Sequence, residues 1–334
     1  MDSLFTDAVR DMLHDHCTPE LVREVEAGGT ADTLWKLLES AGFADALVPE
    51  SAGGAGLSWA EAAPVLELFG RHALPLPLGE TMLVRSLVAA ASVTVPPGLT
   101  TLACAAPADD ETVSCPHVPC GRLAATVLVA FDGEARLLPT AGARRAVFGF
   151  KLDAAMVWPL QAWHDAAPTR LRPPLSLRTL QAAIYSVQLA GAMAAVLERS
   201  LEYANDRQQF GKPIGKFQAI QHQLSLMSEH VFASRMAAQL CMPAEGAVFD
   251  ELRVAMAKAR ASEAAVEVAA LSHSIHGAIG FTAEYPLQLL TRRLHAWRQT
   301  AGSESAWHDV IGRALLTKTD APSLDLLRRL TDMA

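Results

Sequence analysis

The residues best suited to bind a charged ligand lie in the segment RQQFGKPIGKFQ, which starts at Arg207. Arg207 carries a permanent positive charge on a planar group that suits bidentate contacts with phosphate. Phe210 adds an aromatic ring and Gln218 an amide. Such a corner can hold an anionic ligand that contains an aromatic ring. The structural alternative is that Arg207 favours the negative C-terminus of a helix while Phe210 belongs to the core.

Two helices are needed to position this corner. The first is expected to end near Phe210 and Gly211, because Gly211 tolerates positive φ and Pro213 lacks an N–H group. A second helix is predicted to start near Phe217. Helical periodicity supports both, since apolar residues recur at three- and four-residue steps. They are Ala190, Ala194, Leu197, Leu201 and Ala204 in the first helix, and Ile220, Leu224, Met227 and Val231 in the second.

The rest of the chain predicts a mainly α fold with a small β-domain. Residues 1–95 are expected to form helices, one of them from Trp59 to Arg71. Short β-prone runs such as ATVLVAF and RAVFGF follow, separated by glycine and proline turns. Beyond a proline-rich linker, further helices complete a four-helix bundle. We therefore predict domains at residues 1–95, 96–165 and 175–334.

Composition limits the classes of partner. The chain has 334 residues, of which 51% are hydrophobic, and a net charge of -8. An acidic balance without a Lys/Arg cluster argues against nucleic acid or an anionic membrane as the main partner. The N-terminus MDSLFTDAVRDMLHDH does not resemble a secretory signal, and no apolar run reaches the roughly 18 residues of a membrane span. We therefore expect a cytoplasmic protein.

The cysteines do not predict a disulfide framework or a metal site. There are five of them, an odd number. Cys115, His117 and Cys120 in CPHVPC have a spacing that zinc ligands can adopt, but no second ligand pair follows. We expect a plain turn here and predict no metal site.

Three blocks resemble signatures of the acyl-CoA dehydrogenase family, whose members are flavoproteins that desaturate acyl-CoA thioesters between Cα and Cβ. In chain order they are LVPESAGGAGLSWAEAAPVLELFGR, RQQFGKPIGKFQAIQH and SIHGAIGFTAEYPLQLLTRR. The resemblance implies an N-terminal helical domain, a middle β-domain and a C-terminal four-helix bundle. The middle domain looks shortened, and it lacks the two segments that line the flavin ring in the family.

The resemblance also implies an FAD site shared between subunits. Arg207 would contact the pyrophosphate of an FAD in a partner chain, and Phe210, Phe217 and Gln218 would flank its adenine end. Gly277 would allow the backbone to approach the cofactor closely.

The catalytic base of the family has no counterpart at the aligned positions. Desaturation needs a carboxylate to remove the α-proton. Aligning RQTAGSESAWHDVIGRALL with the family block Tyr-Glu-Gly-Thr-x-Gln places Ser303 on the threonine, as a cofactor-binding residue, and Ala301 on the glutamate. The site that some branches use instead falls on Gln181. We expect Glu304 to be a first-turn carboxylate of a helix rather than a base, so no catalytic residue is assigned.

These departures are similar to those of the smaller subunit in heteromeric acyl-CoA dehydrogenases of bacterial steroid breakdown. The sequence thus predicts an FAD-dependent acyl-CoA dehydrogenase, as a homodimer or homotetramer, or the smaller subunit of a heteromer with a larger partner. A flavin-dependent oxidase or monooxygenase on the same fold, and a non-catalytic scaffold subunit, stay open as alternatives. The sequence specifies neither the acyl group nor the electron acceptor.

Overall fold

The computed structural model describes residues 2–94, 96–106, 111–169, 176–244, 246, 248–317 and 323–331. By its internal contacts the chain forms two compact units. Unit 1 comprises Met1–Ala62 and Leu74–Gln181, and unit 2 comprises Ala63–Ala73 and Ala182–Ala334. A short segment from early in the chain therefore belongs to the later unit.

The helices of unit 1 begin where the sequence supplies caps. Thr18 accepts a hydrogen bond from the backbone of Leu21, and Pro19 occupies the first helical turn of α2. Ser58 and Glu61 exchange hydrogen bonds between side chain and backbone, a capping box that starts α4 at the next residue. The helices that lie in this unit or begin in it are α1 (Asp2–His16), α2 (Pro19–Glu26), α3 (Asp32–Ser40), α4 (Trp59–Arg71), α5 (Leu78–Ala90), α6 (Leu160–Asp165) and α7 (Leu177–Asp206).

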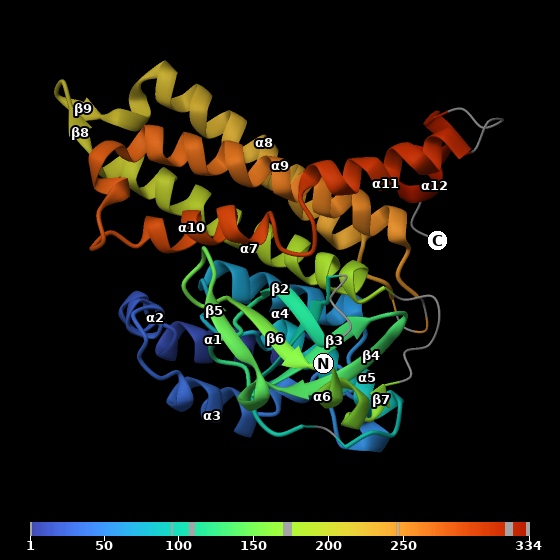
Figure 1. Cartoon of the computed structure of the whole chain (residues 1–334). Coiled ribbons are helices and arrows are strands. Elements are labelled where there is room, and N and C mark those ends of the chain that lie inside the picture. The colour runs from blue at the N-terminus through green and yellow to red at the C-terminus, as the bar shows by residue number, and fades with distance from the viewer. Residues whose placement is uncertain are drawn as a thin grey trace. The chain divides into compact units, whose positions relative to one another are not determined.

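Two small sheets form the β region of unit 1 (Figure 1). The first has strand order β1-β3-β4-β7, with β1 and β3 parallel, and the second has order β2-β6-β5 and is antiparallel. Buried valines and Trp158 pack between them, and the Trp158 indole donates to the Pro139 carbonyl at 2.9 Å. The strands are β1 (Thr100–Cys104), β2 (Thr112–Val118), β3 (Thr126–Phe131), β4 (Glu134–Pro139), β5 (Arg144–Val147), β6 (Ala154–Pro159) and β7 (Pro168–Thr169).

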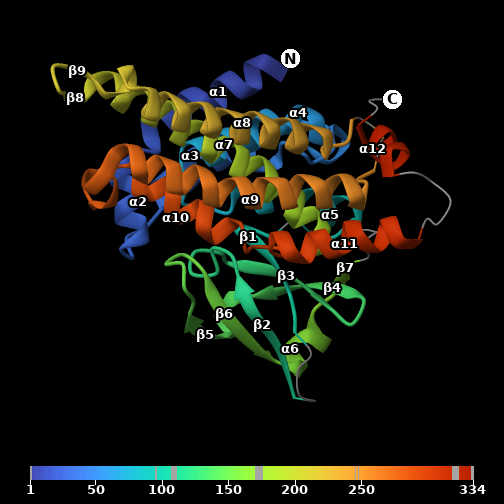
Figure 2. The ribbon, with the colours of Figure 1, turned by 90° about the horizontal axis from the view of Figure 1, so that it is seen from above.

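In the described part of unit 2, the regular structure is helical apart from one small hairpin. Figure 2 shows its two long helices α8 and α9 side by side. Alanines dominate the buried face of α9, which lets its neighbours pack closely. Besides most of α7, the unit contains β8 (Gln208–Gln209), β9 (Lys212–Pro213), α8 (Gln218–Leu240), α9 (Glu251–His276), α10 (Leu287–Trp297), α11 (Glu304–Thr317) and α12 (Ser323–Thr331).

Helices α4 and α7 cross at two glycines within unit 2. A Cβ atom on Gly191 would lie 2.0 Å from the Glu67 carbonyl oxygen, and one on Gly70 would lie 2.0 Å from the Gln188 carbonyl oxygen. No real side chain tolerates such a distance. The crossing therefore requires glycine on both helices.

Helix α7 is the one described helix long and apolar enough to cross a membrane, and its apolar window is entirely buried. A buried apolar helix is what the core of a globular protein requires.

The predicted fold class, mainly helical with a small β region, is confirmed. The three domain boundaries stay a prediction, and residues 170–175 of the expected linker lie outside the described residues. Several local expectations are wrong. Cys115 and His117 lie in strand β2 rather than in a turn, because Cys115 fills the core between the sheets. Leu201, placed on the buried face of α7, is 40% exposed.

Candidate functional site

The predicted corner between two helices is a tight β-hairpin. Helix α7 ends at Asp206, earlier than expected, and β8 then pairs antiparallel with β9. Phe210 and Gly211 form the turn, with φ angles of 51° and 79°. Two consecutive positive φ values are typical of the two-residue turns that match the twist of paired strands. The hairpin closes with the Ile214 amide donating to the Arg207 carbonyl at 2.8 Å.

The side chains of this hairpin are presented to solvent. The Arg207 side chain is exposed and makes no hydrogen bond or ion pair with the described part of the chain. Phe210 is 92% exposed, so the alternative that it belongs to the core is wrong. Its ring stands edge-to-face to Phe217 at 6.1 Å, and the Lys212 ammonium lies 4.4 Å from the Phe217 ring centroid. Gln218, also exposed, begins α8.

The C-terminal end of α9 lies beside this hairpin. The Tyr203 hydroxyl donates to the His276 carbonyl at 3.3 Å, and the two rings stack at 4.5 Å. Tyr203 is only one turn before Arg207 on the chain. Gly277 follows His276 with a φ of 64°, is exposed, and has no atom within 4 Å of the place a Cβ would occupy. The structure thus places Arg207, Phe210, Phe217 and Gln218 in the hairpin and at the start of α8, with Gly277 at the end of the neighbouring helix α9.

Two imidazoles, the buried His276 and the half-buried His273, lie at this corner. The His276 Nδ1 atom lies 2.8 Å from the Ser272 carbonyl, which can only accept, so Nδ1 carries the proton. Its Nε2 atom is buried and has no hydrogen-bond partner among the residues that the structure describes. Burial, and then the charge of Arg199, lower the pKa of His276 below the usual histidine value. Burial likewise lowers the pKa of His273, whose ring stacks on Phe281 at 4.1 Å.

Ser303 does not join the corner. It lies in the turn between α10 and α11, where the buried Lys258 near the start of α9 donates to the Gly302 carbonyl at 3.1 Å. Helix α9 rises about 1.5 Å per residue, so Lys258 and His276 are roughly 27 Å apart along it. The six predicted residues therefore occupy two places at opposite ends of α9.

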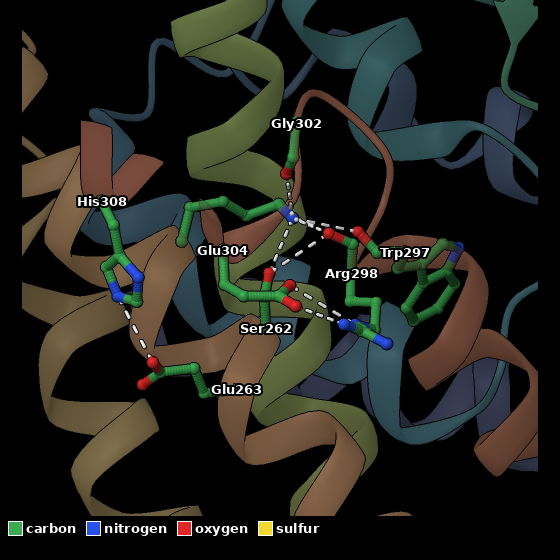
Figure 3. A network of polar contacts seen from close by, with 8 residues as sticks. Ser262, Glu263, Trp297, Arg298, Gly302, Glu304 and His308 are labelled. Carbon is green, nitrogen blue, oxygen red and sulfur yellow. Dashed lines mark hydrogen bonds and ion pairs between the residues drawn. The ribbon is translucent and has the colours of Figure 1, made fainter. Parts of the chain in front are cut away.

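The turn that precedes α11 is held by a polar network (Figure 3). The Lys258 ammonium, which is fully buried, also donates to the Trp297 and Arg298 carbonyls at 3.1 and 2.8 Å. Arg298 and Glu304 form an ion pair across the turn. Figure 3 shows the Glu304 carboxylate directed toward Arg298. A turn tied at so many points presents its backbone in one conformation.

None of the positions considered for a catalytic base offers a free carboxylate. The hydrogen bond from Arg298 lowers the pKa of Glu304, which lies in the first helical turn of α11 as expected. Gln181 is buried, and its amide donates to the Leu102 carbonyl at 3.1 Å. Ala301 has a φ of 59°, and its carbonyl accepts from the Trp307 indole at 3.2 Å.

Sequence reasoning did not single out Lys258, His276 or Lys212. For Lys258 a signal existed, because it interrupts the alanine-rich run VAMAKARASEAA on the buried face of α9. A lysine on such a face must find acceptors. For Lys212 the sequence held no signal that it would lie over an aromatic ring.

Comparisons with known proteins match both ends of the chain to one family. Residues 2–94 match the family model of the acyl-CoA dehydrogenase N-terminal domain, and residues 179–316 match that of the C-terminal domain. Acyl-CoA dehydrogenase IpdE2 of Mycolicibacterium smegmatis is 31% identical over 311 residues, which are 90% of this chain and 94% of that protein.

Solved structures agree. A variant of the Tcur3481–Tcur3483 steroid ACAD is 26% identical with a TM-score of 0.82, covering 96% of this chain and 99% of that one. The ChsE4–ChsE5 complex from Mycobacterium tuberculosis shows the same fold, with a TM-score of 0.79 at 21% identity and coverage of 96% and 98%. From these matches and the shared architecture, the chain belongs to the acyl-CoA dehydrogenase family.

Proposed function

We propose that this chain is the smaller subunit of a heteromeric, FAD-dependent acyl-CoA dehydrogenase. The proposal rests on one observation: the chain has an exposed candidate binding corner but no free carboxylate at the positions considered for the base. A corner with the exposed side chains of Arg207, Phe210 and Gln218 is accessible to a ligand, whereas Ala301, Gln181 and Glu304 offer no free carboxylate. The chain would then contribute to a cofactor site without supplying the base.

The relatives support a two-chain assembly. The steroid ACAD named above carries two gene products in its name, and the ChsE4–ChsE5 structure is described as a complex. The chain aligns with nearly the full length of each matched chain. We therefore expect a larger subunit of the same family as the partner, and an acyl-CoA as the substrate of the assembly.

The corner fits an adenine dinucleotide. Holding Phe210 in the left-handed region costs about 1 kcal/mol, and its exposed ring returns little of this to the isolated chain. Strain at an exposed aromatic residue is typical of ligand sites. Arg207 would pair with the pyrophosphate, Phe210, Phe217 and Gln218 would flank the adenine, and Gly277 would let the backbone approach. Ser303, remote from this corner, would serve the flavin end of a second FAD site.

FAD, when bound, supplies a flavin ring able to accept the hydride from Cβ of the thioester. Within this chain the residues would bind and orient: the Arg207 guanidinium would neutralise phosphate charge, and the Lys258 network would hold the turn that presents Ser303. The α-proton goes to a carboxylate of the larger subunit. We expect the complex in the cytoplasm.

Co-expression with a larger acyl-CoA dehydrogenase of the same source tests this proposal. We expect a stable complex with flavin absorbance between 300 and 550 nm that bleaches when acyl-CoA is added anaerobically, while the chain alone binds FAD weakly. Arg207→Ala should reduce FAD affinity of the complex at least tenfold and leave the unfolding temperature unchanged. Arg313→Ala, an exposed arginine of α11, is the matched control.

Three outcomes would contradict the proposal. Flavin bound by the chain alone and bleached by acyl-CoA would make it a complete enzyme. A co-purified complex without flavin absorbance would favour a scaffold subunit. Flavin reoxidised by oxygen, with no response to any acyl-CoA, would instead indicate an oxidase or monooxygenase.

A further inference from the structure

Strand β5 is an open edge of the three-stranded sheet in unit 1. It pairs with β6 on one side, and no described strand pairs with it on the other. Figure 2 shows β6 with β5 at its outer side. All four residues of β5, Arg144–Val147, are exposed, although successive side chains point to opposite faces. Both faces and one edge of this strand are therefore accessible among the described residues.

The charge around this strand is of one sign. Residues 135–152 contain no aspartate or glutamate, although the whole chain has a net charge of -8. Arg144, Arg145 and Lys151 are exposed and form no ion pair with the described residues. The Arg122 side chain joins them by donating to the Lys151 carbonyl at 2.7 Å. The result is a local cationic patch on an acidic protein.

Apolar groups lie within the same patch. Val147 is 97% exposed. Phe148, 38% exposed, stacks flat on His117 at 4.4 Å. The buried Asp153 carboxylate fixes His117 at 2.7 Å and accepts from the Cys120 amide at 2.9 Å. The segment that follows the edge is thus backed by a rigid support, which lowers the entropy cost of binding there.

We propose that the open edge of β5 binds an extended acidic segment of another protein, which adds to the sheet as a fourth strand. Main-chain hydrogen bonds would supply affinity, as in other cases of strand addition. Specificity would come from the side chains, with two neighbouring acids opposite Arg144 and Arg145 and an apolar residue opposite Val147. The alternative without a binding partner is that the arginines only prevent edge-to-edge aggregation. This inference is independent of the flavin corner.

A synthetic peptide provides the test, with the full chain as the receptor. The probe is fluorescein-labelled Thr-Ile-Thr-Glu-Glu-Thr with blocked ends, and the control peptide carries Lys-Lys in place of Glu-Glu. We expect saturable binding by fluorescence anisotropy at low salt, together with slowed amide exchange in residues 144–147. Arg144→Glu with Arg145→Glu should weaken binding about tenfold or more. Lys36→Glu with Arg313→Glu, an equal charge change at exposed sites, should alter it less than about twofold.

Several results would overturn the proposal. They are absence of saturable binding up to 1 mM peptide, equal affinity for the lysine peptide, equal binding by the Arg144→Glu, Arg145→Glu variant, and exchange protection confined to another element. Light scattering, which measures molecular mass, tests whether a second copy of the chain occupies the edge. Self-association that disappears in the doubly reversed variant would assign the edge to a contact between copies instead.

Discussion

Two single residues differ in what they contribute to the stability of the fold. Lys258 is fully buried and donates to three carbonyls and the Ser262 hydroxyl. Phe210, by contrast, is strained and exposed. Lys258 contributes to the folding stability of the isolated chain. Phe210 would contribute to binding energy, and only when a ligand is bound. Substitutions at the two positions should therefore move different observables.

Lys258→Met should destabilise the chain by about 3 kcal/mol, because it removes a buried donor: the Gly302 carbonyl loses its hydrogen bond, and the Trp297 and Arg298 carbonyls keep only those from the Thr300 amide and the Ser262 hydroxyl. Denaturant unfolding measures this change. Lys36→Met removes an equal charge from an exposed site and should change stability by less than about 0.5 kcal/mol. Equal stability of both variants would show that water replaces the ammonium.

Phe210→Gly should leave the unfolding temperature unchanged or slightly raised, because glycine adopts a φ of 51° without strain. The FAD affinity of the complex should fall by about tenfold through lost stacking. Gly211→Ala provides the contrast, since it adds strain at a φ of 79° while keeping the ring. If Phe210→Gly instead lowered the unfolding temperature, the ring would serve the fold.

At the scale of the element, periodicity was a good guide and turns were not. The apolar stripes placed α8, and the pattern from Trp59 to Arg71 gave α4 to the residue. The hairpin at Phe210 was missed because a phenylalanine with positive φ contradicts its own propensity, and tertiary context overrides it. Helix α10 was missed because its residues were interpreted as a motif.

The positions of some candidate site residues could be predicted from the sequence, and the position of one could not. The motif located Arg207, Phe210, Phe217, Gln218 and Gly277; the first four lie in the hairpin or at the start of α8, and Gly277 follows the end of α9, which contacts Tyr203 one turn before Arg207. No sequence rule could show that Ser303 lies at the other end of α9, because that depends on how three helices pack. The binding roles of all six stay a prediction.

The end of α9 should make the chain sensitive to acid. His276 and His273 have lowered pKa values when folded, so the folded state binds fewer protons than the unfolded state. Stability should therefore fall as the pH drops below the ordinary histidine value of 6.5. The neighbouring charges that oppose protonation are Arg199 and His295, whereas Glu202 and Asp206 lie near Tyr285 on the same corner.

Thermal unfolding between pH 8 and pH 5 measures this effect. His276→Gln, which cannot titrate, should show a smaller loss over that range. Glu304 contributes in another window: its lowered pKa gives stability that disappears only as the pH falls below 4.5. A pH dependence that is identical in the wild type and in His276→Gln would exclude the histidine as its source.

At the scale of the whole molecule, the outer side of α8 is suited to a protein partner. Between Gln218 and Leu240 the only Asp, Glu, Lys or Arg residues are Glu229 and Arg235, and Arg235 pairs with Glu67 at 3.1 Å. Phe232 and Met236, one turn apart, are 60% and 63% exposed. An exposed helix face this poor in charge is typical of a subunit contact.

Phe232→Glu with Met236→Glu should disrupt assembly without unfolding the chain, since both side chains already face solvent in the single chain. Light scattering of the complex, or of the chain alone, measures the mass. We expect the mass to fall to that of smaller species while the circular dichroism spectrum is retained. An unchanged mass would assign the subunit contact to another face.

The crossing of α4 and α7 at Gly70 and Gly191 has a consequence for synthesis on the ribosome. The segment Ala63–Ala73 belongs to unit 2, yet its partner residues on α7 are made roughly 120 residues later, which at bacterial or slower translation rates takes roughly 6–24 s. During that interval the end of α4 lacks the α7 residues that it crosses, although much of unit 1 has already emerged. The nascent chain therefore presents an unpartnered apolar segment to chaperones for seconds, and a ribosome stalled before α7 would leave it exposed.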